Sequence, residues 1–347
     1  MRLRSLIVLG TAAVLLLSGC TGEPTPEVKP SASPSESSSQ TPTPTPEPIV
    51  APETAFAVSC DDVAETMAEL VGEPSTPVEP MLSVVSAMGW LPGPAQHMFQ
   101  RAGGIACSAG DAERNWEVTI VPDAQAVIAG ATERQGYWGE TASCEGGRCA
   151  FELPDGDVLL SATVVDPDLA ADDSAPIEEA LRGVAAAAAA SAREVEYVDS
   201  DIVGAPCERF VTPEQVNAAF GVTDASLFTD FGGWGIPAEV YEVVNGSRIC
   251  YFKSAGSEYE GSSYLMLTTL PAGAWAFETL DGDPVEVEGA DDARASTGEH
   301  GEGILDVRVG LDWIRFMTYD NGSGAADPAP VAETVVRNLT VGHTAPE

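Results

Sequence analysis

The sequence predicts an α+β protein with two tandem similar domains, each an antiparallel sheet with a few packed helices. Three observations support this: an internal repeat, short strand-like segments bounded by turn signals, and six cysteines that the repeat sorts into pairs. We place the first domain at residues 55–193 and the second at 207–341. Residues 194–206 form a linker, and 342–347 form a tail. The 347 residues suit two domains of ordinary size.

Each repeat opens with a cysteine and a short helix that ends at glycine, over residues 60–72 and 207–221. In the second repeat Thr212 is suited to the N-cap and Pro213 to the first helical position. Gln215 completes a capping box, in which two side chains satisfy free backbone N–H groups at the start of a helix.

Further landmarks follow in the same order in both repeats. A Gly-Trp pair followed by proline occupies residues 89–92 and 233–237, and a second cysteine lies 16 or 17 residues beyond the tryptophan. Each repeat then has an apolar run ending in proline, which we expect to open a second helix, and a final helix after an Ala-Pro pair. We expect strands at 116–120, 158–165, 264–270, 305–309 and 313–317.

Six of the seven cysteines are assigned to disulfides. The repeat pairs equivalent cysteines, and the two left over flank a Gly-rich turn. A metal site or redox pair is the alternative for these two, but their Cys-x4-Cys spacing is not the usual one for zinc and no histidine lies nearby. The expected bonds are Cys60–Cys107, Cys207–Cys250 and Cys144–Cys149. Such bonds indicate an oxidising compartment.

The first 19 residues have the pattern of a secretory signal peptide. Arg2 and Arg4 precede an apolar run at 6–17 that is too short to span a bilayer as a helix. The run ends in Leu-Ser-Gly-Cys, which resembles a bacterial lipobox. This resemblance implies cleavage before Cys20 and lipidation of its sulfur; an ordinary secreted protein is the alternative.

Residues 20–54 are rich in Pro, Ser and Thr and have almost nothing to bury, so we expect a disordered tether. Sugars on its threonines stay an open question. The whole chain has 54 acidic and 16 basic residues and a formal net charge of −38. This excess of negative charge repels phosphates and argues against nucleic acid as a partner.

At these landmarks the chain resembles a family of actinobacterial secreted lipoproteins of unknown function. The resemblance covers the second repeat better than the first, where Ser108 stands in place of an aromatic residue. It implies secretion, lipidation and a disulfide-containing α+β domain, and it carries no catalytic residues. The matching positions are Cys207, Thr212, Val216, Gly221, Cys250 and Tyr251 in the second repeat, and Cys60, Gly72 and Cys107 in the first.

Motifs for catalysis are missing from the sequence. It has no Gly-x-Ser-x-Gly, no His-Glu-x-x-His and no phosphate-binding loop, so we expect no enzyme, no cofactor and no metal centre. Acidic runs at 166–173 and 281–292 are expected to be solvated, with weak calcium binding as the alternative. Trp138 is the best candidate for an exposed aromatic side chain. The three histidines, His97, His300 and His343, are expected at the surface.

The sequence therefore favours a lipoprotein at the extracytoplasmic face of the cell membrane, anchored through Cys20. It would act as a non-catalytic binding or interaction module for an unknown envelope protein or ligand. A carrier of lipids or other hydrophobic ligands and an envelope hydrolase using carboxylates are the alternatives. A pocket in either repeat, or near the junction at 194–206, would discriminate among them.

Overall fold

The computed structural model describes residues 49–83, 93–228, 235–256, 261–322 and 324–341. From residue 48 onward the chain forms one compact unit, which contains two antiparallel sheets. The predicted signal peptide, most of the tether and Cys20 lie outside the described residues. The same holds for Trp90, Trp234 and His343.

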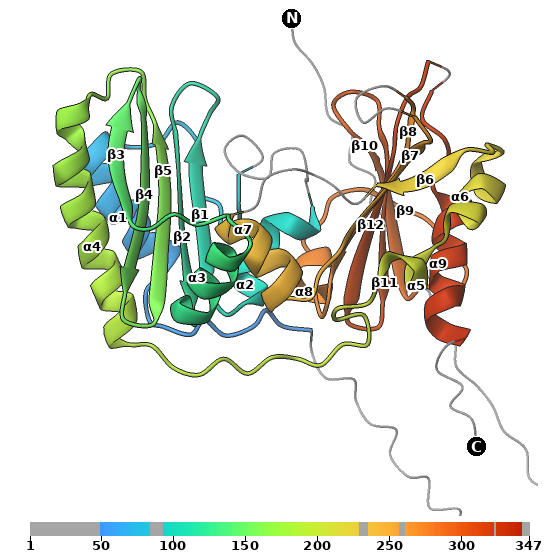
Figure 1. The fold of residues 1–347 in the computed structure, drawn as a ribbon, viewed down its shortest axis with the longest axis horizontal. Coiled ribbons are helices and arrows are strands. Elements are labelled where there is room, and N and C mark those ends of the chain that lie inside the picture. The colour runs from blue at the N-terminus through green and yellow to red at the C-terminus, as the bar shows by residue number, and fades with distance from the viewer. Residues whose placement is uncertain (1–48, 84–92, 229–234, 257–260, 323, 342–347) are drawn as a thin grey trace, which may run out of the picture. The chain divides into compact units, whose positions relative to one another are not determined.

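The first repeat contains five strands and several helices, in the order shown in Figure 1. They are α1 (Cys60–Val71), η1 (Pro94–His97), α2 (Met98–Arg101), β1 (Ile105–Gly110), β2 (Asn115–Pro122), α3 (Ala124–Glu133), β3 (Thr141–Glu145), β4 (Arg148–Asp155), β5 (Val158–Val165), η2 (Ala171–Asp173) and α4 (Ser174–Ala190).

The second repeat has the same succession with strands added at both edges of its sheet. Its elements are α5 (Cys207–Phe210), α6 (Pro213–Phe220), β6 (Ala225–Phe228), α7 (Ile236–Ala238), the π-helical η3 (Glu239–Val244), β7 (Ile249–Ser254), β8 (Ser263–Leu270), α8 (Ala274–Phe277), β9 (Asp283–Pro284), β10 (Asp292–Thr297), β11 (Gly303–Val309), β12 (Asp312–Thr318) and α9 (Ala329–Val341).

The order of strands shows that the repeats share one topology. The first sheet has the order β1-β2-β5-β4-β3, and the second contains β7-β8-β12-β11-β10 in the corresponding places. β6 and β9 extend the second sheet at its two edges. In the first repeat a single bridge between Glu79 and Ser108 stands where β6 pairs with β7. The predicted fold class is confirmed.

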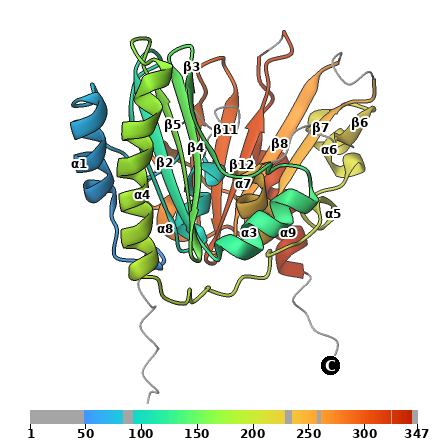
Figure 2. The same ribbon diagram turned by 60° about the vertical axis from the view of Figure 1, so that its left-hand side comes forward.

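Each sheet buries one face beneath its own helices. In the first repeat α1 and α4 lie over this face, as Figures 1 and 2 show, and alternate residues such as Val118 and Ile120 of β2 point into the core beneath them. In the second repeat α5, α6 and α9 cover the corresponding face, with Leu265 and Leu267 of β8 buried. This alternation is the period-two pattern that antiparallel strands require.

The expected helix signals operate, with one difference. Thr212 caps α6 through a complete capping box, and Gly221 ends this helix in the left-handed conformation at φ 67°. The helix predicted at 207–221 is nevertheless two helices, because Val211 is extended at φ −157° and ψ 143°. This break lets Phe210 and Val211 both point into the core.

The prolines at the ends of β2 and β8 precede helices, as expected. Pro122 is the last residue of β2, and α3 begins two residues later. After Pro271 the chain makes only the single turn of α8. The two final helices, α4 and α9, are where the Ala-Pro pairs predict them.

A third cluster of buried side chains joins the two repeats. It includes Met98 and Phe99 of α2, Val127 of α3, Tyr241 of η3 and Met266 of β8. The helical segment η1–α2 of the first repeat contacts β8 and β12 of the second, and α7–η3 contacts α2 and α3. Each repeat therefore contributes a helical segment to the packing of the other.

Polar contacts reinforce this shared cluster. The buried Asn245 donates from Nδ2 to the backbone oxygen of Met98 at 2.9 Å. Glu239, which is 3% exposed, pairs with Arg134 at 2.9 Å. A buried carboxylate requires such a partner, because desolvation without compensation is costly.

The register of the sheets identifies equivalent residues in the two repeats. In the core, Ala162 of β5 pairs with Phe151 of β4, and at the equivalent place Phe316 of β12 pairs with Leu305 of β11. The residues that follow on β4 and β11 are both acidic, and because side chains alternate along a strand they point to the opposite face from the core.

These two acids have different partners. Asp306 accepts hydrogen bonds from Nε of Arg315 at 2.7 Å and from the indole of Trp313 at 2.7 Å, and it is 2% exposed. At the equivalent place Glu152 accepts from the Ser161 hydroxyl at 2.6 Å. The second repeat thus holds a buried ion pair where the first holds a neutral donor.

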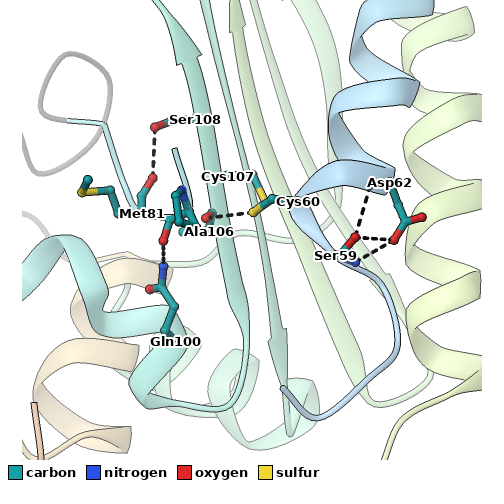
Figure 3. The surroundings of a disulfide bond; sticks show 9 residues. Ser59, Cys60, Asp62, Met81, Gln100, Ala106, Cys107 and Ser108 are labelled. Carbon is teal, nitrogen blue, oxygen red and sulfur yellow. Dashed lines mark hydrogen bonds between the residues drawn. A yellow bond between two sulfur atoms is a disulfide. The ribbon is translucent and has the colours of Figure 1, made fainter. Parts of the chain in front are cut away.

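The three expected disulfides are present in the structure. Cys60 bonds Cys107, and Cys207 bonds Cys250, with Cα separations of 5.5 and 5.6 Å. The first bond ties α1 to β1, and the second ties α5 to β7. Figure 3 shows the first bond beside the Ser59 cap of α1, with Cys60 Sγ 3.4 Å from the backbone oxygen of Ala106.

The disulfides differ in the length of chain they close, which gives a stability prediction. Cys60 and Cys107 are 47 residues apart and Cys207 and Cys250 are 43 apart, whereas Cys144 and Cys149 are 5 apart. Loop-closure entropy gives about 4 kcal/mol for each long bond and about 2 kcal/mol for the short one. Paired Cys→Ala variants should lower the free energy of unfolding in urea in that ratio. Equal losses for the short and a long bond would contradict the prediction.

Candidate functional site

The acidic runs do not form a metal centre in the part of the chain that the structure describes. There, no three His, Cys, Asp or Glu side chains are grouped as metal ligands would be. Asp166 and Asp168 both pair with Arg114. The side chains of the second run, at 281–292, are mostly exposed to solvent. Trp138 is exposed, as predicted, at 85%.

His97 lies in the interior, so the prediction of a surface histidine is wrong at this position. Its ring packs edge-on against Trp275 at 5.5 Å and lies 5.8 Å from Trp313, both in the second repeat. Burial, and to a lesser extent the charge of Arg315, lowers the pKa of His97 to about 4. A neutral imidazole therefore fills a position between the repeats. His300 is exposed, as expected.

The linker between the repeats lies between two pockets that share Asp199, Ser200 and Asp201. We call them the first and second linker pockets. The first has a volume of about 420 Å³ and the second about 640 Å³. Both volumes are in the range of small-molecule sites. The pockets lie at the junction, residues 194–206, where a pocket is expected to discriminate among the candidate functions.

Arg101 fixes the linker and lines the second linker pocket. Its guanidinium donates to the backbone oxygen of Pro271 at 2.7 Å and to that of Val198 at 3.0 Å. It also lies 5.4 Å from the centre of the Tyr197 ring. The residue is 3% exposed, and among the described residues it forms no ion pair with a carboxylate. The Asp312 carboxylate acts on this charge from a distance and helps to keep Arg101 protonated. A buried charge without a directly paired carboxylate favours an anionic partner.

Asn245 lines the same pocket. Its amide orientation is fixed because Nδ2 donates to Met98, which directs Oδ1 the other way. Oδ1 is buried and accepts no hydrogen bond from any described residue. Buried polar atoms without a partner are rare in folded proteins, so each requires an explanation.

The first linker pocket contains a half-buried carboxylate, that of Asp312. Asp312 accepts a hydrogen bond from the backbone N–H of Ala272 at 2.7 Å, and it also interacts with Ser200. Its pKa is raised, mainly by burial and further by the nearby charge of Asp201. Arg209 and apolar side chains such as Leu339 complete the lining.

Exposed apolar side chains gather around both pockets. Tyr197, Val198 and Val203 belong to the linker, and Leu311 lies in the turn between β11 and β12. Exposed apolar groups that surround a pocket with a few polar groups are typical of a binding site.

A smaller pocket of about 140 Å³ lies on the outer face of the first sheet. Two carboxylates, Glu117 and Glu152, line it, and Ile236 and Pro237 of α7 close it. Burial raises the pKa of Glu152. Glu117 accepts a hydrogen bond from the backbone N–H of Ser83 at 2.7 Å, and Glu152 accepts one from Ser161. Each carboxylate therefore already has a hydrogen-bond donor within the protein.

A scan of protein-family models, a search of curated proteins and a search of solved structures found no match to this chain. None of the described helices has the length and apolar character needed to cross a bilayer. The chemistry of the linker pockets is therefore the basis for a functional proposal.

The sequence analysis placed interest at the junction but missed Arg101, Asn245 and Asp312. An alignment of the repeats contains a signal for two of them. Counting back from Cys107 and Cys250, Arg101 is opposite Val244, and Asn245 is opposite Ala102. A polar residue opposite an apolar one, at the end of equivalent helical segments, marks a place where the repeats have different roles.

The buried neutral His97 gives a pH prediction. Its pKa of about 4 lies below the value near 6.5 of an unfolded chain, so the unfolded state binds the proton more readily. The stabilising contribution is complete above pH 6.5 and is lost as the pH falls towards 4. This loss amounts to about 3 kcal/mol.

Urea unfolding at pH 7 and pH 4.5 should show this contribution as a difference between the protein and His97→Phe. The variant should lose less stability on acidification, because it lacks the group that must be protonated on unfolding. His300→Gln, at an exposed position, is the matched control and should behave as the unmodified protein does. An identical acid response in all three proteins would contradict the assignment.

Proposed function

We propose that the protein is a lipid-anchored binding module of the cell envelope, and that the linker pockets are its binding site. The observation that carries the proposal is the gathering of exposed apolar side chains around two pockets that also contain a buried guanidinium, Arg101, and a half-buried carboxylate, Asp312. The lipobox-like segment ending at Cys20 supports the anchor, and the disulfides favour an oxidising compartment.

Packing within each repeat favours a surface site over a hydrophobic carrier. Between each sheet and its covering helices the described side chains form one buried cluster, with Val118 and Leu181 at 0% exposure in the first repeat and Leu267 and Val335 at 0% in the second. A carrier for lipid would need a large apolar cavity in that place.

The pocket of Glu117 and Glu152 is the feature that a hydrolase would use. The raised pKa of Glu152 suits a general acid. The volume of this pocket, about 140 Å³, is below the range of typical ligand sites, and each of the two carboxylates already accepts a hydrogen bond from the protein. These features favour binding at the linker over catalysis here.

A comparison of surface variants tests the binding site. After crosslinking of intact envelopes, the unmodified protein should recover a specific partner or ligand. Leu311→Glu places a charge at the rim of the first linker pocket and should reduce recovery about tenfold. Val285→Glu makes the same change at another exposed apolar position and is the matched control. Equal recovery with both variants would place the binding site elsewhere.

The anchor has a separate test. Cys20→Ser removes the sulfur that would carry lipid, so the protein should leave the detergent phase and should not incorporate labelled palmitate. The double variant Cys144→Ser and Cys149→Ser loses two other cysteines and should stay in the detergent phase. Retention of Cys20→Ser with the membrane would overturn the lipid anchor.

A further inference from the structure

We propose that the second linker pocket binds a small zwitterion that carries an amine and a carboxylate, of the size of an amino acid or dipeptide. This inference rests on the proposed function and specifies the ligand class of that site. It follows from a buried cation and a buried acceptor on the pocket wall, next to acidic and apolar side chains of the linker.

Arg101 is the group for the carboxylate. Nε and Nη2 donate to backbone oxygens of Pro271 and Val198, which orients the guanidinium plane. The remaining terminal nitrogen, Nη1, has no partner among the described residues. Burial lowers the pKa of Arg101 without making it neutral in the physiological range, so the charge persists. The nearby Asp312 carboxylate favours the charged form of Arg101 without pairing with it. A ligand carboxylate would supply a directly bonded counter-charge through charge-assisted hydrogen bonds.

Asn245 and Asp199 are the groups for the amine. Asn245 is 1% exposed and its Oδ1 accepts nothing from the described residues, so a ligand N–H would satisfy it. Asp199 is exposed on the linker and lines the same pocket, where its carboxylate attracts an ammonium group. Together they offer one neutral acceptor and one negative charge.

Apolar side chains provide a surface for the body of the ligand. Val203 of the linker and Val244 of η3 line the pocket, and the Tyr197 ring is held beside Arg101. The volume of about 640 Å³ leaves room for an apolar side chain between the two polar ends.

The net charge of the protein favours a zwitterion over a simple anion. Residues 55–347 contain 49 acidic and 13 basic residues, which repel a ligand with net negative charge. A zwitterion is neutral overall, so it can reach Arg101 without this penalty. The acidic linker then favours the amine end near Asp199.

Calorimetric titration of the mature protein with the dipeptide Leu-Leu tests the inference. Two modified probes, N-acetyl-Leu-Leu and Leu-Leu amide, each lack one of the two charges. We expect the unmodified dipeptide to bind, and each modified probe to bind at least about tenfold more weakly, since each loses a charge-assisted contact.

Variants of the protein assign the two ends. In Asp199→Asn, acetylation of the dipeptide should no longer cost affinity, because the carboxylate that attracts the ammonium group is gone. Arg101→Gln should bind the dipeptide and its amide equally weakly. Because Arg101 also holds the linker, Arg101→Gln must first show the near-ultraviolet circular dichroism of the unmodified protein. If the spectrum changes, Asp199→Asn alone still tests the inference.

Three outcomes would overturn the inference. They are no binding of Leu-Leu at millimolar concentration, equal affinity for all three probes, and an unchanged effect of acetylation in Asp199→Asn. If any of them occurs while Leu311→Glu still reduces recovery from crosslinked envelopes, the linker site stands and its ligand is of another class. If both experiments fail, the proposed function fails with the ligand class.

Discussion

The packing of each repeat's helical segment against the other repeat is the constraint on which the rest of the structure depends. Met98, Phe99 and Tyr241 bury their side chains in one cluster, and Asn245 ties the two segments together through Met98. This cluster covers sheet faces that would otherwise be exposed. It also fixes where the linker must run, because Arg101 at the end of α2 holds Val198.

Polar groups in this region are arranged so that burial does not leave charge without compensation. Asp306 has Arg315 and Trp313 as donors, and Glu239 has Arg134. His97 avoids the difficulty by being neutral at physiological pH. Arg101 differs from these groups, since its described hydrogen bonds go to backbone oxygens alone. For this reason we regard the other buried groups as structural and Arg101 as a candidate for binding a ligand.

Much of the fold could be predicted from local patterns. The capping box at Thr212 and the stop at Gly221 specify a helix within a few residues, and the apolar run at 158–165 coincides with β5. The disulfide pairing followed from the repeat, because equivalent cysteines in equivalent domains have equivalent partners.

The contacts between the repeats could not be predicted in this way. His97 has no local feature that distinguishes it from a surface histidine; its burial depends on Trp275, which is 178 residues away in the chain. Likewise, Arg101 and Asn245 acquire their roles only when the repeats pack together, since Arg101 bonds Val198 of the linker and Asn245 bonds Met98 of the first repeat. Such roles come from tertiary packing, which a single sequence records weakly.

The equivalence of Glu152 with Asp306, and of Ser161 with Arg315, has a consequence for how this molecule can change. In a symmetric homodimer both subunits carry the same residue at each position, so every substitution at the interface occurs on both sides at once. Here the two halves are encoded by separate stretches of one gene, and each half can mutate alone. The two halves therefore need not match, and they differ here, with an ion pair in one half and a hydroxyl in the other.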